Sequence, residues 1–235
     1  MIHDNYTQYD AAMSINGVNL DTYGVLVESF TVGATEVTNE TFQGRNRTGF
    51  NVLSSVFGMR SFTVSLFYTG KTRREITLKK STVDAMLFGR LDILLPDGLH
   101  YDSVLESAGE LKILGVQNDK VIGLCPYSFR GLQHDPLLTS TGNTVICQST
   151  IPQTSCRLTC TASQAYASLT IDTVTITNVH QGDVLVVDGI EGRILQNGAP
   201  CAGNMSFQHF PALVPGQNTL SCPETLQVEY YPTYI

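Results

Sequence analysis

Residues 182–198 read GDVLVVDGIEGRILQNG, and this stretch decides the class of fold. It contains two short apolar runs with the length and composition of β-strands, Val184–Val187 and Arg193–Gln196. Between the runs lie Asp188, Gly189 and Gly192. Because glycine and aspartate tolerate the backbone angles of tight hairpins, the two runs predict neighbouring antiparallel strands.

The residues that follow continue this pattern of short strands and turns. Asn197-Gly198 is a turn signal directly after the second run. Phe210-Pro211 and Pro215-Gly216 predict further turns, because proline fixes its own φ and cannot donate to a strand ladder. Leu213 and Leu220 remain between them as apolar anchors. The stretch is typical of an all-β protein and contains no recognisable catalytic arrangement.

Length and composition agree with a large β protein. The 235 residues suffice for one large β domain or two smaller ones. Hydrophobic residues make up 42% of the chain, which allows a real core, whereas charged residues make up only 15%, which is low for a helical soluble protein. The formal net charge of -7 argues against a nucleic-acid-binding surface over the whole protein, although a local basic patch remains possible.

No targeting or membrane segment is visible in the sequence. The first residues, Met1–Asp10, are polar and acidic and lack the apolar centre of a signal peptide. The apolar runs are all shorter than the roughly 20 residues that a membrane-spanning helix needs. We therefore expect a protein that is made and assembled in a cytoplasm and does not insert into a membrane.

The six cysteines predict buried thiols rather than a metal site. None forms a Cys-x-x-Cys pair, and no histidine lies at zinc-finger spacing. Cys156, Leu158 and Cys160 alternate with polar residues, as on a strand. Both thiols would then lie on one face about 13 Å apart, which is too far for a disulfide between them. A disulfide framework is the less favoured alternative.

The first half of the chain also predicts strands. Ser61–Tyr68 alternates, with Phe62, Val64, Leu66 and Tyr68 on one face. Strand pairs are expected on either side of Pro96-Asp97-Gly98 and of Asn118-Asp119: Leu91–Leu95 with His100–Glu106, and Lys112–Gln117 with Lys120–Leu124. Gly44–Gly58 has no clean period, and we interpret it as a long loop or an extended hairpin arm.

One short helix is expected in this half. Ser81 can cap it, and Val83, Met86 and Leu87 fall on one helical face. Gly89 stands where a left-handed residue often ends a helix. The preceding Gly70–Lys80 is basic and is interpreted as a loop.

Composition changes near Gly131, where a segment rich in Gly, Ser and Thr begins. We therefore predict two β domains, residues 1–132 and 133–235. Short apolar runs with turn signals recur after this point, including a turn at Asp172-Thr173, and indicate a β-sandwich.

Candidate chemical groups have simple structural interpretations. Asp183, Asp188 and Glu191 cluster in sequence, but no loop repeats oxygen ligands at the spacing of a calcium loop, so we expect turn-forming carboxylates. The histidines are scattered and are expected to be surface or hydrogen-bonded residues. We predict no catalytic residues, no metal and no cofactor.

Two basic segments stand apart from this pattern, Arg45–Arg47 and Lys71–Arg74. They could face nucleic acid or an acidic partner, but a solvated charged surface is the favoured explanation.

The whole chain resembles the distal tail proteins, or baseplate hub family, of long, non-contractile-tailed bacteriophages. In the first half, the segments that carry the resemblance are Arg47-Thr48-Gly49-Phe50, then Gly58-Met59-Arg60 with Ser61–Tyr68, the short helix leading into Leu91–Leu95, Pro96-Asp97-Gly98 and His100-Tyr101, and finally Leu124-Cys125-Pro126-Tyr127. In the second half they are Gly182–Gly198, Phe210-Pro211-Ala212-Leu213, Pro215-Gly216-Gln217-Asn218 and Glu229-Tyr230-Tyr231-Pro232. Each motif is weak alone, and their order carries the resemblance.

The resemblance implies a mainly β protein with an N-terminal belt domain, related to the β-barrel of tail-tube proteins, and a C-terminal galectin-like sandwich. It implies a hexameric ring at the distal end of the virion tail. The ring would contact the tail tube protein and a hub or tail-fibre protein, and receptor-binding proteins are a further candidate partner. DNA would pass through it in transit.

Within such a ring, we expect one side of the subunit interface at Arg45, Arg47, Phe50 and Phe57, and channel-facing charges at Arg73 and Arg74. Two alternatives remain open. One is a carbohydrate-binding module, which the absence of Trp disfavours because Trp stacks on sugars. The other is a tail-tube component or the equivalent part of a phage-derived bacteriocin.

Overall fold

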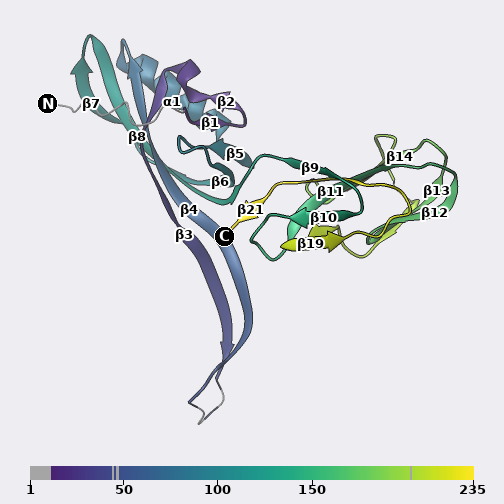
Figure 1. Cartoon of the computed structure of the whole chain (residues 1–235). Coiled ribbons are helices and arrows are strands. Elements are labelled where there is room, and N and C mark those ends of the chain that lie inside the picture. Colours follow the sequence, from purple (N-terminus) through teal and green to yellow (C-terminus); the bar gives the residue numbers. More distant parts are fainter. Residues whose placement is uncertain (1–11, 44, 46–47, 202) are drawn as a thin grey trace. The chain divides into compact units, whose positions relative to one another are not determined.

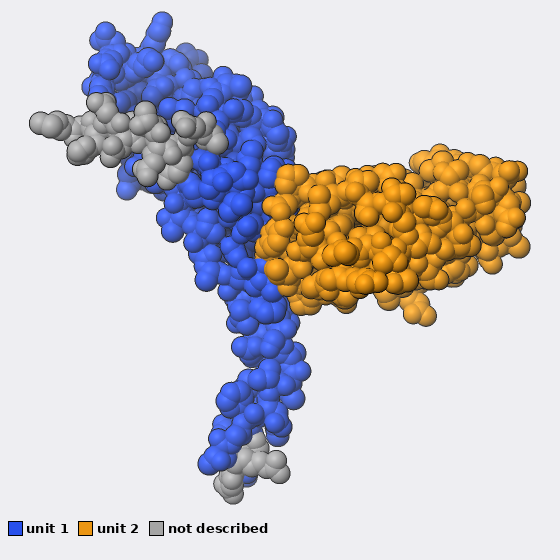
Figure 2. Space-filling view, in the orientation of Figure 1, with its two compact units in different colours: residues 1–134, 235 blue, residues 135–234 orange. Residues whose placement is uncertain are grey.

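The computed structural model describes residues 12–43, 45, 48–201 and 203–235. It contains two compact units (Figure 2). Unit 1 comprises residues 1–134 together with 235, and unit 2 comprises residues 135–234.

Unit 1 is built around one antiparallel sheet (Figure 1). Its strands are β1 (Ser14–Ile15), β2 (Val18–Asn19), β3 (Val25–Phe42), β4 (Asn51–Gly70), β5 (Leu91–Leu94), β6 (His100–Ala108), β7 (Lys112–Gln117) and β8 (Lys120–His134). The strand order is β2-β1-β5-β6-β8-β4-β3, and β7 also pairs with β8. A short 3-10 helix (Leu20–Tyr23) and the helix α1 (Arg73–Met86) complete the unit.

The predicted alternation of Ser61–Tyr68 is confirmed, because Phe62, Val64, Leu66 and Tyr68 are all buried in the core of unit 1. The ring of Phe62 stacks on that of Phe129 from β8, with 5.1 Å between the ring centroids. Phe62 also packs on Tyr101 from β6, at 4.8 Å. One face of the sheet therefore forms the core.

The helix begins earlier than the sequence predicted. Thr72, not Ser81, is its N-cap, and the Thr72 side chain accepts a hydrogen bond from the backbone N–H of Glu75 at 3.2 Å. The prediction was wrong because α1 is mostly polar and exposed, with only Ile76 and Val83 buried along its length. Because the first half of α1 is charged and has few apolar residues, its sequence looks like that of a basic loop. The predicted end is close to the observed one, and Gly89 has a positive φ of 80°.

Unit 2 is also made of antiparallel strands. They are β9 (Leu138–Thr141), β10 (Thr144–Cys147), β11 (Thr154–Thr161), β12 (Tyr166–Ile171), β13 (Val174–Val179), β14 (Val184–Asp188), β15 (Arg193–Gln196), β16 (Ala199–Pro200), β17 (Met205–Phe207), β18 (Ala212–Leu213), β19 (Gly216–Thr219), β20 (Gln227–Tyr230) and β21 (Thr233–Tyr234). The largest sheet has the order β16-β15-β14-β11-β20-β9, and β18 also pairs with β11. Smaller sheets are β12-β13-β17 and β10-β19.

The core of unit 2 lies between these sheets. Leu158 and Val187 come from the largest sheet, Ile171 and Ile176 come from β12 and β13, and all are buried in one cluster. This is a sandwich, as the sequence predicted. A closer likeness to galectins stays a prediction.

The stretch that opened the sequence analysis folds as expected. β14 and β15 pair as antiparallel neighbours, with Val187 opposite Ile194. Asn197 and Gly198 have φ values of 51° and 79° and join β15 to β16. Positive φ at both positions is what a two-residue hairpin of the mirror-image type requires. The turn predicted at Asp172-Thr173 joins β12 to β13, and Asp172 has a φ of 54°.

The six cysteines are all free thiols, and those of the strands are buried. Cys156 and Cys160 both lie on β11 in the core of unit 2, as the alternation predicted. Cys222 is only partly buried. These side chains therefore serve as small apolar core residues.

Candidate assembly interface

A long two-stranded arm projects from unit 1 (Figures 1 and 2). The pairing between β4 and β8 ends at Arg60 and Gly131, whereas β3 and β4 remain paired as far as Phe42 and Asn51. The residues of β4 that precede Arg60 therefore pair with β3 alone. We call residues 36–43, 45 and 48–59 the arm. Of the two sequence interpretations, a long loop or an extended hairpin arm, the structure supports the hairpin arm for Asn51–Gly58, which belongs to β4.

The root of the arm is fixed to the sheet of unit 1 by two arginines. Arg60 donates from Nε to the hydroxyl of Thr35 at 2.9 Å and from Nη1 to Gln133 at 2.9 Å. Arg130 pairs with Glu36 at 2.8 Å and with Glu106 at 3.4 Å. These bonds connect β3, β4, β6 and β8, so the arm starts from a defined direction.

The arm itself is apolar yet exposed. Its exposed large hydrophobic residues are Val37, Phe42, Phe50, Val52, Leu53, Val56, Phe57 and Met59. They lie on both faces, because Val56 and Phe57 are consecutive on a strand and point in opposite directions. A two-stranded ribbon is only marginally stable in water, and an apolar patch of this kind usually marks an interaction surface. The arm therefore has the properties of a segment that is completed by a partner.

Three of the four predicted interface residues lie on this arm. Phe57 is 40% exposed and stands opposite Val37 in the ribbon. Phe50 is 65% exposed and directly precedes β4. Arg45 is exposed, and Arg47 lies outside the described residues.

Arg73 and Arg74 are exposed on the first turn of α1 rather than in the expected loop. A cation at a helix N-terminus is disfavoured by the helix dipole, by roughly 0.3–1 kcal/mol. The helix dipole therefore does not account for the two arginines at this position.

A second exposed apolar surface occurs on β7 and was not predicted from the sequence. Ile113, Leu114 and Val116 are exposed, and Val116 is 72% exposed. Among the strands that the structure describes, β7 pairs only with β8, so its other edge is open. A register shift between Ile113 and Gly115 leaves Leu114 outside the ladder. The run Lys112–Gln117 predicted the strand, but nothing in it indicated that its apolar side chains would be exposed.

The β7 edge and the tip of the arm lie at opposite ends of unit 1 (Figure 1). A heterologous interface needs two different patches on one subunit, so that the patch of one copy meets the other patch of the next. The arm and the β7 edge satisfy this requirement within unit 1.

The clustered carboxylates of unit 2 form turns and ion pairs. Asp188 is fully buried, and its Oδ2 accepts from Arg157 Nε at 3.0 Å and from Arg193 Nε at 3.2 Å. Its Oδ1 accepts from the backbone N–H groups of Ile190 and Glu191, both at 3.1 Å. With its oxygens committed in this way, Asp188 is a structural carboxylate.

Asp183 has a similar role in the adjoining hairpin. Its carboxylate accepts from Asn197 Nδ2 at 2.7 Å, from the backbone N–H of His180 at 2.7 Å and from Gln196 at 2.7 Å. Three donors favour the ionised form and lower the pKa of Asp183 to about 2.

Among the described residues, no helix is long and apolar enough to cross a membrane.

Most of unit 2 matches a known protein family. Residues 144–234 match the family model described as the siphovirus-type tail component, C-terminal domain. No curated protein matches the chain.

The fold of almost the whole chain has solved relatives. The chain is similar to the SPP1 Dit protein, described as a paradigm of the hub adsorption apparatus in phages that infect Gram-positive bacteria. The match has a TM-score of 0.74 and 12% sequence identity, and it covers 95% of this chain and 99% of SPP1 Dit. It is also similar to a chain of the phage P2 baseplate in its activated conformation, with a TM-score of 0.52 in the Ca structure and 0.53 in the Sr structure. Both P2 matches have 8% identity and cover 91% of this chain and 92% of that one.

The family match includes β14, β15 and their hairpin, which are the elements that decided the fold class. The SPP1 Dit match extends the same fold through unit 1. Residues 144–234 therefore match the C-terminal domain of the siphovirus-type tail component, and the chain has the same fold as SPP1 Dit.

Proposed function

We propose that copies of this chain close into a hexameric ring at the distal end of the tail, where the ring joins the tail tube to the hub or fibre proteins. The observation that carries the proposal is the arm, an apolar ribbon that nothing within the described part of unit 1 covers. The similarity in fold to SPP1 Dit and to a chain of the P2 baseplate supports the same role. The role is structural and requires no catalytic residue.

In this ring, the arm of one copy lies against the β7 edge of the next. Phe50 and Phe57 supply apolar area on the arm, and Leu114 and Val116 supply it on β7. A further strand can also add to the open edge of β7 through backbone hydrogen bonds. Since the two patches differ, each copy uses both, and the assembly closes when the rotation between copies fits.

The remaining partners follow from this arrangement. The ring contacts the tail tube protein on one side and the hub or fibre protein on the other, and unit 2 is available for receptor-binding proteins. Arg73 and Arg74 face DNA in transit through the ring.

An arm deletion tests the proposal. Replacing Thr38–Val56 by Asn-Gly joins the cross-strand partners Val37 and Phe57 through a short turn. None of the deleted residues belongs to the core of unit 1, so the variant is expected to fold. Light scattering should show monomers for this variant and for Phe50→Ser/Phe57→Ser.

The control is Ile146→Ser, which changes an apolar residue on β10 of unit 2 that is even more exposed than Phe50 and Phe57. This variant should keep the ring. If the arm-deletion variant still forms rings with the same number of subunits as the wild type, the proposed interface is refuted.

A further inference from the structure

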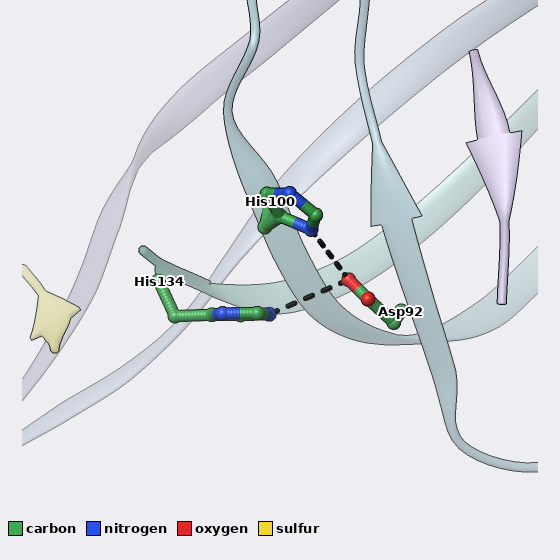
Figure 3. A group of neighbouring side chains, drawn as sticks. All are labelled: Asp92, His100 and His134. Carbon is green, nitrogen blue, oxygen red and sulfur yellow. Dashed lines mark hydrogen bonds and ion pairs between the residues drawn. The ribbon is translucent and has the colours of Figure 1, made fainter. Parts of the chain in front are cut away.

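Three side chains from three strands converge on one side of the unit 1 sheet (Figure 3). They are Asp92 on β5, His100 at the start of β6 and His134 at the end of β8. Asp92 Oδ1 lies 3.0 Å from His100 Nδ1 and 3.5 Å from His134 Nε2. One ligand atom from each residue lies within 4.8 Å of the other two.

The register of the sheet brings these residues together. His100 and His134 are direct partners between β6 and β8, and their ring centroids lie 5.4 Å apart. Asp92 is opposite Asp102, which shares a face of β6 with His100. Cross-strand partners point to the same face, as do alternate residues along a strand. The group is thus set by three adjacent strands.

The neighbours of the group leave Asp92 available while fixing its position. The backbone of Asp92 is held by Asn16. The Asn16 N–H donates to Asp92 O at 2.7 Å, and the Asp92 N–H donates to the Asn16 side-chain oxygen Oδ1 at 2.8 Å. Asp102 is occupied by Arg90, which donates from Nε at 2.7 Å and from Nη2 at 2.8 Å. The acidic residue beside the group is therefore already neutralised.

We propose that Asp92, His100 and His134 bind one Zn²⁺ ion. Two imidazole nitrogens and a carboxylate oxygen are a common zinc ligand set, with water in the fourth position. Calcium and magnesium prefer sets made of oxygen alone, so the two histidines select against them. Bond lengths near 2.0–2.2 Å in a tetrahedral site place ligand atoms roughly 3.3–3.5 Å apart. The two distances from Asp92 lie close to this separation.

The alternative is a hydrogen-bonded cluster in which ring N–H groups donate to Asp92. Zinc displaces those protons, since it binds only the unprotonated nitrogen. The residue positions suit zinc in another respect, because His134 is buried at the base of the group while Asp92 is half exposed and leaves a path for the ion. A bound ion would cross-link β5, β6 and β8. The proposal does not depend on ring formation.

The test uses the full chain after treatment with EDTA and dialysis. Calorimetric titration with ZnCl₂ should give one ion per chain, and Co²⁺ in its place should show the visible absorption bands of a tetrahedral site. The melting temperature of unit 1 should rise by about 5 °C or more at a hundredfold excess of zinc over Kd.

Variants assign the ion to these residues. His100→Ala and Asp92→Asn change side chains at the accessible side of the group and should abolish the stoichiometric binding, whereas His180→Ala and Cys222→Ser should retain it. His134→Ala should also abolish binding, but it changes a buried side chain, so the other two variants decide. A wild-type chain without stoichiometric binding, or binding unchanged in His100→Ala, overturns the proposal.

Discussion

At the scale of single residues, the ionised carboxylate of Asp183 stabilises the β14–β15 hairpin. Asn197, the N–H of His180 and Gln196 all donate to it, and these bonds lower the pKa of Asp183 to about 2 from an ordinary value of 3.8. Because the folded pKa is the lower one, the contribution of Asp183 is fully present above about pH 4 and is lost as the pH falls toward about 2.

Asp183→Asn should therefore flatten the acid dependence of unit 2 stability in this window, while making unit 2 less stable near neutral pH. Hydrogen exchange of the β14 and β15 amides between pH 2 and pH 5 (roughly the range that the shift covers) measures the effect. Asp119→Asn, in the β7–β8 turn of unit 1, is the matched control. A wild-type profile retained by Asp183→Asn would contradict this assignment.

A buried pair of tyrosines connects the sheet of unit 1 to α1. Tyr68 and Tyr127 share a hydrogen bond of 2.9 Å between their hydroxyls, and Tyr127 donates to Asp84 on α1 at 2.8 Å. Burial raises the pKa of both tyrosines. Both stay protonated and act as hydrogen-bonding groups.

Tyr127→Phe should cost about 1–3 kcal/mol, since it leaves the buried hydroxyl of Tyr68 without its partner. Tyr68→Phe/Tyr127→Phe should cost less than the sum of the single variants, because both hydroxyls are then absent. Urea unfolding of the single and double variants measures the coupling, and strict additivity would exclude the shared bond.

Residue-scale features differ in how far the sequence reveals them. The core face of Ser61–Tyr68 could be predicted because alternation is local. The β5–β6 hairpin that carries Asp92 and His100 was predicted, but the group with His134 was not, since it depends on the pairing of β6 with β8, whose paired ends are distant in sequence.

At the scale of elements, α1 shows which local signal the sequence analysis missed. Thr72 and Glu75 have the spacing of a capping box, and Glu75 also accepts from the N–H of Lys71 at 2.8 Å. The apolar residues of α1 were few, so the charged segment before Ser81 was assigned to a loop. The N-cap at Thr72 indicated the start of the helix better than the apolar pattern did.

Thr72→Ala should destabilise unit 1 by about 0.5–2 kcal/mol, because it removes the bond to the Glu75 N–H. Ser81→Ala, at an exposed position inside α1, should be neutral or slightly stabilising, since alanine favours a helix interior. Thermal unfolding by circular dichroism compares the two variants. The reverse order would restore Ser81 as the cap.

The arm shows why periodicity fails in one kind of strand. Both faces of the ribbon are exposed, so no face requires an apolar pattern within the chain. The residues of Gly44–Gly58 therefore gave no clean period, although Asn51–Gly58 belongs to β4.

At the scale of the whole molecule, reversing the charge of Arg73 and Arg74 tests whether DNA passes through the proposed ring beside them. Arg73→Glu/Arg74→Glu places carboxylates at the N-terminus of α1, where the helix dipole favours them. The variant should fold at least as well as the wild type. A phage that carries it should form complete particles with a lower infectivity, measured as plaques per particle, and unchanged infectivity would remove the channel role.

The proposed ring could not be predicted from local pattern, because the interface of any ring lies between copies and no single chain contains it. The short strands and their turns followed from the residues, whereas the proposed ring entered only through the family resemblance.

The mass of the purified chain tests the central claim most directly. Light scattering, with negative-stain images of the same peak, should show a closed ring of about six subunits with a central hole. A chain that stays monomeric at every concentration, and that also fails to join the tail tube and hub proteins, would contradict the account.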